Sequence, residues 1–191
     1  MYIKRDLEDK IRHYLESPEI IIVLGPRQSG KSTLLQNILK DLSDANFLDF
    51  EDVDILSLFE SDVKTFASLY VETFRYVLMD EIQYAQNFGK NMKFLYDTYK
   101  DKVKFIVTGS SATDFYLKGL KYLVGRAFIF HLYPFSFREF LAFKNIRLIS
   151  LVQKSAVQPE LSKFIEEFVV FGGYPRVVLA ETGDEKKIIL K

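Results

Sequence analysis

One segment constrains the fold of this chain more than any other, and it reads Gly25-Pro26-Arg27-Gln28-Ser29-Gly30-Lys31-Ser32. It fits the spacing G-x-x-x-x-G-K-[ST], a glycine-rich loop whose backbone surrounds phosphate oxygens between a strand and a helix. The unbroken apolar run over 20–24 predicts a strand that is buried on both faces. Apolar residues that repeat at helical spacing from Leu34 predict the helix that follows. The sequence therefore predicts a strand, a phosphate-binding loop and a helix in succession.

The residue types in this loop suit a nucleotide polyphosphate. Backbone N–H groups and the helix N-terminus attract phosphate oxygens, and Lys31 reaches toward the β and γ phosphates. Ser32 is placed to ligate Mg²⁺. An ordinary glycine-bearing turn between a strand and a helix is the alternative interpretation. The candidate nucleotide-binding residues are Gly25, Pro26, Arg27, Gln28, Ser29, Gly30, Lys31, Ser32 and Thr33.

A second informative stretch, Tyr76–Glu81, joins an apolar run to two carboxylates. The run predicts a buried strand, and ligands of open α/β sheets bind at the carboxyl ends of strands. Asp80 is therefore a candidate for supporting Mg²⁺. Because successive strand residues face opposite ways, Glu81 is expected to point in another direction and to polarise the water that attacks the γ-phosphate. Two solvated carboxylates at the end of a strand are the alternative.

Two further apolar runs adjoin polar residues of interest. The run over 103–107 predicts a strand that ends in Thr108-Gly109-Ser110-Ser111, whose hydroxyls could touch the γ-phosphate or the attacking water. The alternative is a turn that caps a helix beginning near Ala112. Arg126 precedes the last run, over 127–130, and is a candidate for contributing charge to the γ-phosphate of a neighbouring subunit. The other possibility for Arg126 is a surface pair with an acid.

The remaining patterns predict several helices and one strand. Ile3, Leu7, Ile11 and Leu15 recur at helical spacing, which predicts a first amphipathic helix with one packed stripe that ends before Pro18. Acidic residues at 51–54 favour capping of the next helix over catalysis. Other predicted elements are a strand over 46–50, two short helices within 55–69, a helix over 88–99, a helix from near Ser136 that has a capping box with Glu139, and a helix over 161–169 that ends at Gly172-Gly173-Tyr174-Pro175.

The composition excludes several classes of protein. The chain has 191 residues, of which 48% are hydrophobic, enough for one substantial core. Its 26 basic and 26 acidic residues balance, so the total charge lacks the footprint of a dedicated nucleic-acid binder. Cysteine is absent and the two histidines, His13 and His131, are far apart, which argues against a zinc site. We find no signal segment and no membrane segment, and we expect a cytoplasmic protein.

In combination these motifs resemble those of prokaryotic AAA-type ATPases, in particular the group whose phosphate loop reads G-P-R-Q-x-G-K. The loop is similar to the Walker A segment of that group, and most of the chain takes part in the resemblance. The other matching segments are Leu78–Gln83 for the D-E-I-Q form of Walker B, 108–111 for sensor 1 with Ser110 as the closest match, Gly125-Arg126 for a G-R segment, 132–137 for L-Y-P-x-S-F, and 172–175 for G-G-Y-P.

The resemblance implies an α/β fold of the P-loop NTPase class. We expect a five-stranded, mainly parallel sheet with helices on both faces, in which the Walker B strand does not directly follow the Walker A strand. It implies an ATPase core with an N-terminal helix over 1–133, and a helical lid with the start of a truncated C-terminal region over 134–191. Arg126 lies near the usual arginine-finger position. Members of the group usually continue into a C-terminal domain, through which DNA or a protein client could bind.

The predicted function is Mg²⁺-dependent binding and hydrolysis of ATP, coupled to a conformational change, in a chain that can form a homo-oligomer. Two alternatives stay open. A P-loop kinase would need an acceptor site and would have little use for a Glu directly after the Walker B Asp. A nucleotide-gated binding module would bind without turnover. GTP is disfavoured because no N-K-x-D segment is present. The predicted catalytic residues are Glu81, Lys31, Arg126 and Ser110, and the predicted Mg²⁺ ligands are Ser32 and Asp80.

Overall fold

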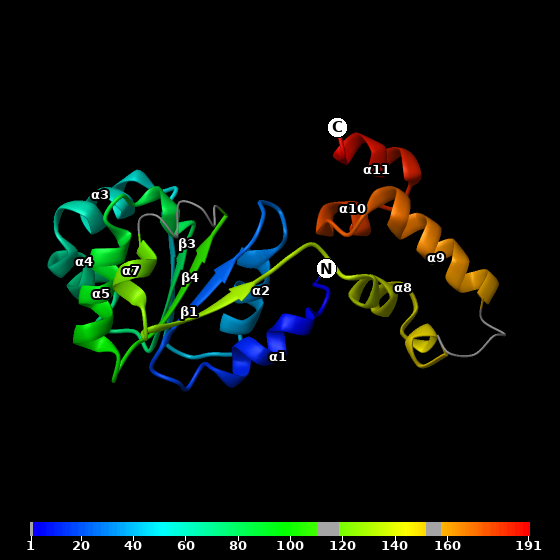
Figure 1. Cartoon of the computed structure of the whole chain (residues 1–191). Coiled ribbons are helices and arrows are strands. Elements are labelled where there is room, and N and C mark those ends of the chain that lie inside the picture. The colour runs from blue at the N-terminus through cyan, green and yellow to red at the C-terminus, as the bar shows by residue number, and fades with distance from the viewer. Residues whose placement is uncertain (1, 111–118, 152–157) are drawn as a thin grey trace. The chain divides into compact units, whose positions relative to one another are not determined.

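The computed structural model describes residues 2–110, 119–151 and 158–191. The chain divides into two compact units, coloured along the chain in Figure 1. The core unit comprises residues 7–26 and 31–132, and the second unit comprises residues 1–6, 27–30 and 133–191. The predicted phosphate loop therefore contributes residues to both units. The sequence predictions that fall on Ser111 and on a helix near Ala112 lie outside the described residues.

The core unit is built on one five-stranded sheet, which confirms the predicted fold class. Its strands are β1 (Ile20–Leu24), β2 (Ala45–Asp49), β3 (Tyr76–Asp80), β4 (Lys104–Gly109) and β5 (Ala127–His131). They lie in the order β2-β3-β4-β1-β5, and all pairs are parallel. The β4 strand separates β1 from β3, so the two strands that lead to the predicted site residues are not hydrogen-bonded to each other.

Burial of the strands follows their sequences. Every residue of β1, β3 and β4 is buried, as expected for central strands of a parallel sheet that is covered on both faces. The edge strands β2 and β5 are less buried. Buried side chains of β1 and β3 pack in one core with the helices that follow β2 and β3.

Helices cover both faces of this sheet (Figure 1). On one face lie α3 (Val53–Ser61), α4 (Val63–Tyr70), α5 (Phe88–Tyr99) and α7 (Lys121–Leu123), and on the other lie α1 (Asp6–His13) and α2 (Lys31–Leu39). A short 3-10 turn, η1 (Ile82–Tyr84), follows β3. The Asp52 carboxylate accepts hydrogen bonds from the backbone N–H groups of Asp54 and Ile55, which confirms that the acidic run caps α3.

The first helix begins later than the apolar periodicity predicts. It starts at Asp6, and Ile3 lies before it, in a cluster with Phe135 and Phe140. The prediction of one helical stripe is therefore wrong at both ends, since Ile3 precedes the helix and Leu15 follows its last residue, His13. The backbone N–H of Asp6 donates to Glu139 Oε1 at 2.8 Å, which satisfies one of the donors that a helix start leaves unpaired. Spacing along the sequence cannot reveal a partner so distant in the chain.

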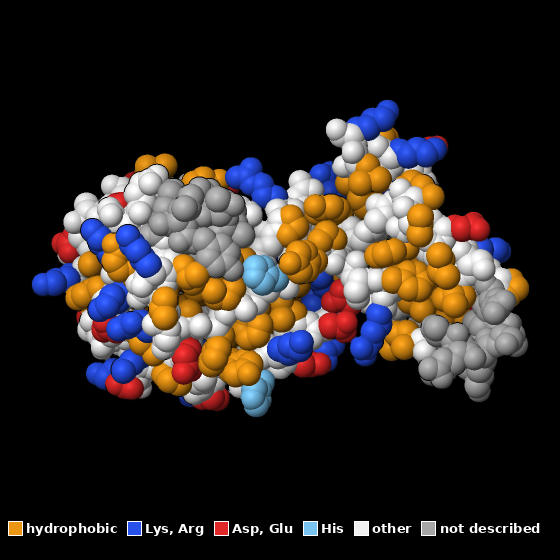
Figure 2. Space-filling view, in the orientation of Figure 1, with side chains coloured by type: hydrophobic (Ala, Val, Ile, Leu, Met, Phe, Trp, Pro, Cys, Tyr) orange, Lys and Arg blue, Asp and Glu red, His pale blue; other side chains and the backbone are white. Residues whose placement is uncertain are grey.

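The second unit gathers four helices around aromatic side chains. They are α8 (Phe137–Leu151), which is kinked at Asn145, α9 (Gln158–Phe171), α10 (Pro175–Leu179) and α11 (Gly183–Ile189). The rings of Phe137 and Phe140 both pack on Phe168, with centroid separations of 5.4 and 5.2 Å. Other hydrophobic side chains of these helices are exposed, among them Val169 and Ile188. Figure 2 shows hydrophobic side chains on the surface of the molecule. None of the helices that the structure describes is both long and apolar enough to cross a membrane.

The turn after α9 requires glycine at one position. A Cβ atom on Gly173 would lie 2.1 Å from the carbonyl oxygen of Phe135, too close for any side chain. The backbone N–H of Phe135 donates to Gly173 O at 2.7 Å, so the two backbones are in direct contact. The G-G-Y-P segment therefore holds the turn tightly against the residues that precede α8.

The predicted capping box at the start of α8 is confirmed. The backbone N–H of Ser136 donates to Glu139 Oε2 at 2.8 Å, and the N–H of Glu139 donates to Ser136 Oγ at 3.2 Å. Burial by itself raises the pKa of Glu139, but hydrogen bonds from Arg5, Ser136 and Asp6 outweigh it and hold the pKa below its ordinary value of 4.5. Glu139 is therefore ionised in the folded chain at neutral pH.

We expect the substitution Glu139→Gln to lower the free energy of unfolding at pH 7 by about 1–3 kcal/mol, the worth of a hydrogen bond to a charged group. As pH falls below the ordinary value of 4.5, the unfolded chain takes up the proton before the folded chain does. The stabilising contribution of Glu139 is thus complete above that value and is lost as pH falls through its lower folded-state pKa. Urea unfolding at pH 7 and pH 3.5 should show the two proteins converging at the lower pH. A stability difference that is unchanged at pH 3.5 would contradict this assignment.

Candidate functional site

The carboxyl ends of three central strands meet at one edge of the sheet. At this edge β1 continues into Gly25, β3 into Glu81 and β4 into Ser110. The parallel register pairs Leu24 with Gly109, and the backbone N–H of Gly25 donates to Gly109 O at 3.3 Å. The topology therefore brings together three segments that the sequence singles out separately, at the edge where open α/β sheets bind ligands.

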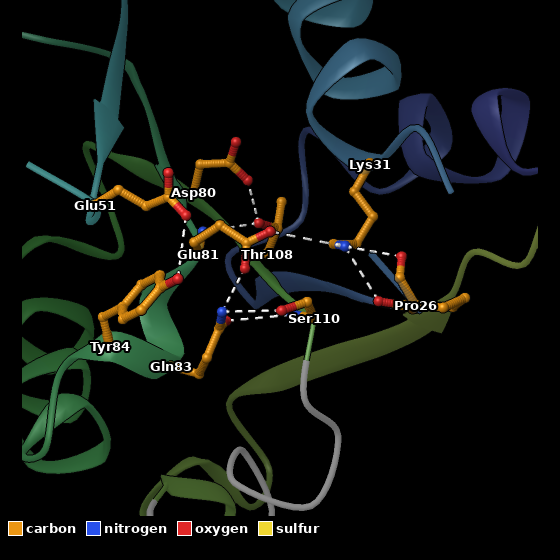
Figure 3. A network of polar contacts seen from close by, with 10 residues as sticks. Pro26, Lys31, Glu51, Asp80, Glu81, Gln83, Tyr84, Thr108 and Ser110 are labelled. Atoms are coloured by element: carbon orange, nitrogen blue, oxygen red, sulfur yellow. Dashed lines mark hydrogen bonds and ion pairs between the residues drawn. The ribbon is translucent and has the colours of Figure 1, made fainter. Parts of the chain in front are cut away.

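The side chain of Lys31 is buried at this edge, with 3% of it exposed. Its Nζ atom donates to Gly25 O at 3.1 Å and to Pro26 O at 3.2 Å. The same ammonium lies 3.9 Å from Glu81 Oε1, and Figure 3 shows the two side chains pointing toward each other. The α2 helix begins at Lys31, so Ser32 and Thr33 occupy its first turn. Backbone N–H groups there have no partner within the helix.

Thr108 joins the two carboxylate residues. Its hydroxyl donates to Oδ1 of Asp80, which is buried, and accepts the backbone N–H of Glu81 at 3.0 Å (Figure 3). The sequence pattern placed Thr108 in a cluster of hydroxyls but favoured Ser110 as the match to sensor 1. The signal that could have identified Thr108 is its place at the end of β4, the strand that pairs with β3.

Glu81 does not continue the β3 strand. Its φ angle is 53°, in the left-handed region that non-glycine residues seldom adopt. The expectation that strand alternation sets the direction of Glu81 is therefore wrong, because the strand ends at Asp80. The hydrogen bond from the Glu81 N–H to Thr108 supports this backbone conformation. Strained backbone of this kind clusters at active sites and ligand clamps.

Gln83 connects Glu81 with Ser110. Its Nε2 atom donates to Glu81 Oε2 and to Ser110 Oγ, the latter at 3.1 Å. Its Oε1 atom accepts the backbone N–H of Ser110 at 3.2 Å. The sequence motif included Gln83 without assigning it a role. The buried amide of Gln83 thus binds both Glu81, the predicted general base, and Ser110 at the end of β4.

Arg126 lies at the opposite edge of the sheet from Lys31 and Glu81. It precedes Ala127, which pairs with Ile20 at the start of β1, whereas the phosphate loop follows the other end of that strand. The length of β1 separates the two edges by roughly 13 Å. Arg126 Nε donates to Asp97 Oδ1 at 3.0 Å. Arg126 is therefore not part of the site of its own chain, and its predicted action on a neighbouring subunit stays a prediction.

The middle of the phosphate loop, residues 27–30, groups with the second unit. Arg27 and Gln28 are exposed, whereas Ser29 is fully buried. Gln28 and Gly30 have φ angles of 63° and 94°, so the loop changes direction through left-handed backbone at two positions. Such conformations turn successive N–H groups toward one side and form concavities that bind anions.

The donor set at the sheet edge suits Mg²⁺. Across residues 2–110, 119–151 and 158–191, no group of three or more His, Asp or Glu side chains could hold a metal ion. The Asp80 carboxylate and the Ser32 hydroxyl offer oxygen atoms, and Mg²⁺ usually binds through one or two carboxylates, water and substrate phosphates. The hydrogen bond from Thr108 fixes the Asp80 carboxylate in place. These residues fit an Mg²⁺ ion that binds together with a nucleotide.

The strand order, the glycine-rich loop between β1 and α2, and the carboxylates after β3 define the fold of a P-loop ATPase. Residues 17–141 match the family described as AAA domain. The chain belongs to this family, which confirms the resemblance seen in its motifs.

Two relatives and two solved structures are similar to this chain. The Methanocaldococcus jannaschii protein MJ1544 is 30% identical over 196 residues, which cover 99% of this chain and 42% of that protein. MJ1637 of the same organism is 33% identical and covers 83% of this chain and 36% of its own length. The chain thus spans less than half the length of these relatives.

The Walker-type ATPase PABY2304 of Pyrococcus abyssi is similar in fold, with a TM-score of 0.61 and 20% identity. The similarity covers 93% of this chain and 65% of the PABY2304 chain. The Aeropyrum pernix ORC2 protein has a TM-score of 0.54 and 16% identity, covering 77% and 52% of the two chains.

Proposed function

We propose that the chain binds ATP with Mg²⁺ and hydrolyses it to ADP and phosphate. The observation that supports this most is the convergence of one ammonium and two carboxylates at the carboxyl edge of the sheet. Lys31 Nζ lies 3.9 Å from Glu81 Oε1, and Thr108 is hydrogen-bonded to both Asp80 and Glu81. The arrangement combines phosphate binding, metal support and a general base within one small region.

Each side chain has a distinct role in this proposal. The backbone N–H groups of the loop and of the α2 N-terminus bind the phosphates together with Lys31. Ser32 and Asp80 hold Mg²⁺, which would supply charge that neutralises the phosphate oxygens. Glu81 orients a water molecule in line with the γ-phosphorus and accepts its proton as the bond to the bridging oxygen breaks. Ser110 responds to the γ-phosphate or the attacking water, and the hydrogen bonds of Gln83 to Ser110 and Glu81 support this role.

One experiment separates this function from its two rivals. The protein is incubated with ATP and Mg²⁺, and free phosphate is measured with and without EDTA. The same reaction with γ-labelled ATP is repeated with nucleotides and small alcohols as possible acceptors. We expect free phosphate that is abolished by EDTA and no labelled acceptor. Labelled acceptor would favour a kinase, and ATP binding without phosphate release would favour a nucleotide-gated binding module.

We expect the substitution Gln83→Leu to lower kcat for ATP hydrolysis about tenfold and to leave ATP affinity unchanged. Leucine has a similar size but cannot donate to Glu81, and the loss of a hydrogen bond to a charged group corresponds to about tenfold or more. Steady-state phosphate release and equilibrium ATP binding measure the two quantities separately. Gln36→Leu, at an exposed position of α2, serves as the matched control. Equal loss of affinity and kcat in Gln83→Leu would refute a positioning role for Gln83.

Coupling to a conformational change belongs to the same proposal. Residues 134–191 are proposed as a helical lid with the start of a further region, and Arg126 is proposed to act on the site of a neighbouring subunit in a homo-oligomer. DNA or a protein is proposed as the client. Mass measurement of the protein with ATP, with ADP, and with and without DNA tests the homo-oligomer and the DNA client. A monomer under every condition would refute the role of Arg126.

A further inference from the structure

Arg5 lies in the short segment before α1 and is almost fully buried, with 4% of the residue exposed. Its guanidinium donates in three directions, with Nη1 to Ser29 O at 2.9 Å, Nη2 to Tyr133 O at 2.6 Å and Nε to Glu139 Oε1 at 3.0 Å. Its Cζ atom lies 4.4 Å from the centroid of the Phe135 ring. All of these residues belong to the second unit. A planar cation with fixed partners on every side has little freedom to move.

The bond to Ser29 fixes one peptide group of the phosphate loop. In a trans peptide the carbonyl and the following N–H point in opposite directions. The Ser29 carbonyl points at Arg5, so the N–H of Gly30 points away from Arg5. Gly30 has a φ angle of 94°, which glycine adopts without a steric penalty. Arg5 thus determines the direction of a backbone donor that lies one residue before Lys31.

The side chain of Ser29 does not support the loop by hydrogen bonding. Its Oγ atom is buried and has no hydrogen-bond partner in the part of the chain that the structure describes. Gly30 lies against Arg5 and Pro175, because a Cβ atom on Gly30 would make van der Waals contact with Arg5 Nη1 at 3.7 Å and with Pro175 Cγ at 3.6 Å. The orientation of the Ser29–Gly30 peptide group is therefore set from outside the loop, by Arg5 and the residues that hold it.

We infer that Arg5 is a positioning residue for nucleotide binding, because it holds the Ser29–Gly30 peptide group in the orientation that directs the Gly30 N–H to the phosphates. The inference rests on the proposed function, since it requires that the loop binds a nucleotide. It adds a residue before α1 to the groups that determine phosphate affinity. Through the same guanidinium, Tyr133 and Glu139 act on the loop as well.

The test depends on the difference between arginine and lysine. Lysine keeps the positive charge but loses the planar fork that reaches three acceptors at once. We expect Arg5→Lys to weaken equilibrium ATP binding, and to raise KM for hydrolysis, by about tenfold, the effect of losing one hydrogen bond to a charged group. The value of kcat should change by less than about threefold, because Glu81 and its partners stay intact.

Arg12→Lys is the matched control, because Arg12 pairs instead with Glu8 and Asp41. It should leave ATP affinity, KM and kcat at wild-type values. Urea unfolding of each variant without nucleotide measures stability independently. If Arg5 only stabilises the fold, Arg5→Lys will lower the urea midpoint of unfolding without changing ATP affinity. That result would overturn the inference.

Failure of the proposed function gives a different pattern. A folded wild-type protein that does not bind ATP would refute the function, and the inference with it. Wild-type binding with equally tight binding by Arg5→Lys would refute the inference alone. If Arg5→Lys does not fold, Glu139→Gln takes its place, since it leaves Arg5 present but removes its ion pair. We expect about threefold weaker ATP binding by Glu139→Gln at pH 7, and unchanged affinity would overturn the inference.

Discussion

Replacing Glu81 with glutamine is expected to lower the rate of ATP hydrolysis by about 10²–10⁴-fold, the usual contribution of a general base. Glutamine matches the size of glutamate and can still bond to Gln83, but it cannot accept a proton from water. Equilibrium binding of ATP should change little, because the phosphates are bound by the loop and Lys31. Phosphate release and ATP binding, measured on the same preparation, test both parts of the expectation.

Glu51→Gln is a suitable control for this variant. Glu51 is exposed and accepts a hydrogen bond from the Tyr84 hydroxyl at 3.1 Å, away from Lys31 and Thr108 (Figure 3). Its substitution should leave hydrolysis at the wild-type rate. If Glu81→Gln also hydrolysed ATP at the wild-type rate, Glu81 would not be the base. If instead the wild type bound ATP without turnover, a nucleotide-gated binding module would replace ATP hydrolysis as the proposed function.

The second large effect is expected for Lys31→Ala, which should weaken ATP binding by about tenfold to a hundredfold or more. The estimate corresponds to the loss of hydrogen bonds from a charged donor to phosphate oxygens. The ammonium is buried beside Gly25 O and Pro26 O, so its charge acts at short range in a poorly solvated site. Isothermal titration with ATP, and separately with ADP, measures the loss.

Lys40→Ala provides the comparison, because Lys40 follows directly after α2 and is exposed. Its affinity for ATP should equal that of the wild type. A second variant, Lys31→Met, keeps the bulk of the side chain and separates lost charge from lost packing. Unchanged ATP affinity in both Lys31 variants would count against the whole proposal, because every assigned role depends on phosphates being bound at this loop.

The motifs, through the family that they resemble, predicted the fold, and the ends of the apolar runs predicted the sheet edge at which the candidate residues meet. The loop over 25–32 and the acids at 80 and 81 each follow an apolar run that predicts a buried strand, and parallel strands bring such ends to one edge. The caps at Asp52 and Ser136 were equally predictable, since their partners lie within three residues. In these cases the residues that make the determining contacts are close together in the sequence.

Contacts between distant residues could not be predicted in the same way. The left-handed backbone of Glu81 depends on a hydroxyl 27 residues further along the chain. The late start of α1 depends on Glu139, and the contact of Arg5 with Ser29 crosses 24 residues. Periodicity and motif spacing contain no information on such pairs, so the sequence could not predict the contacts that support the candidate residues.

The hydroxyl of Thr108 has one hydrogen, and this imposes a direction on the bonds around it. The hydrogen goes to Asp80, while the oxygen receives the amide hydrogen of Glu81. Polarisation therefore runs from main chain to hydroxyl to carboxylate, and neighbouring bonds in such a chain strengthen one another. In the proposed function, a cation bound at Asp80 would draw negative charge from its carboxylate. It would thereby weaken the hydrogen bond from Thr108 to Asp80 and, through it, the bond from the Glu81 amide to Thr108. Occupancy of Asp80 would in this way act on the conformation of Glu81 without any movement of the sheet.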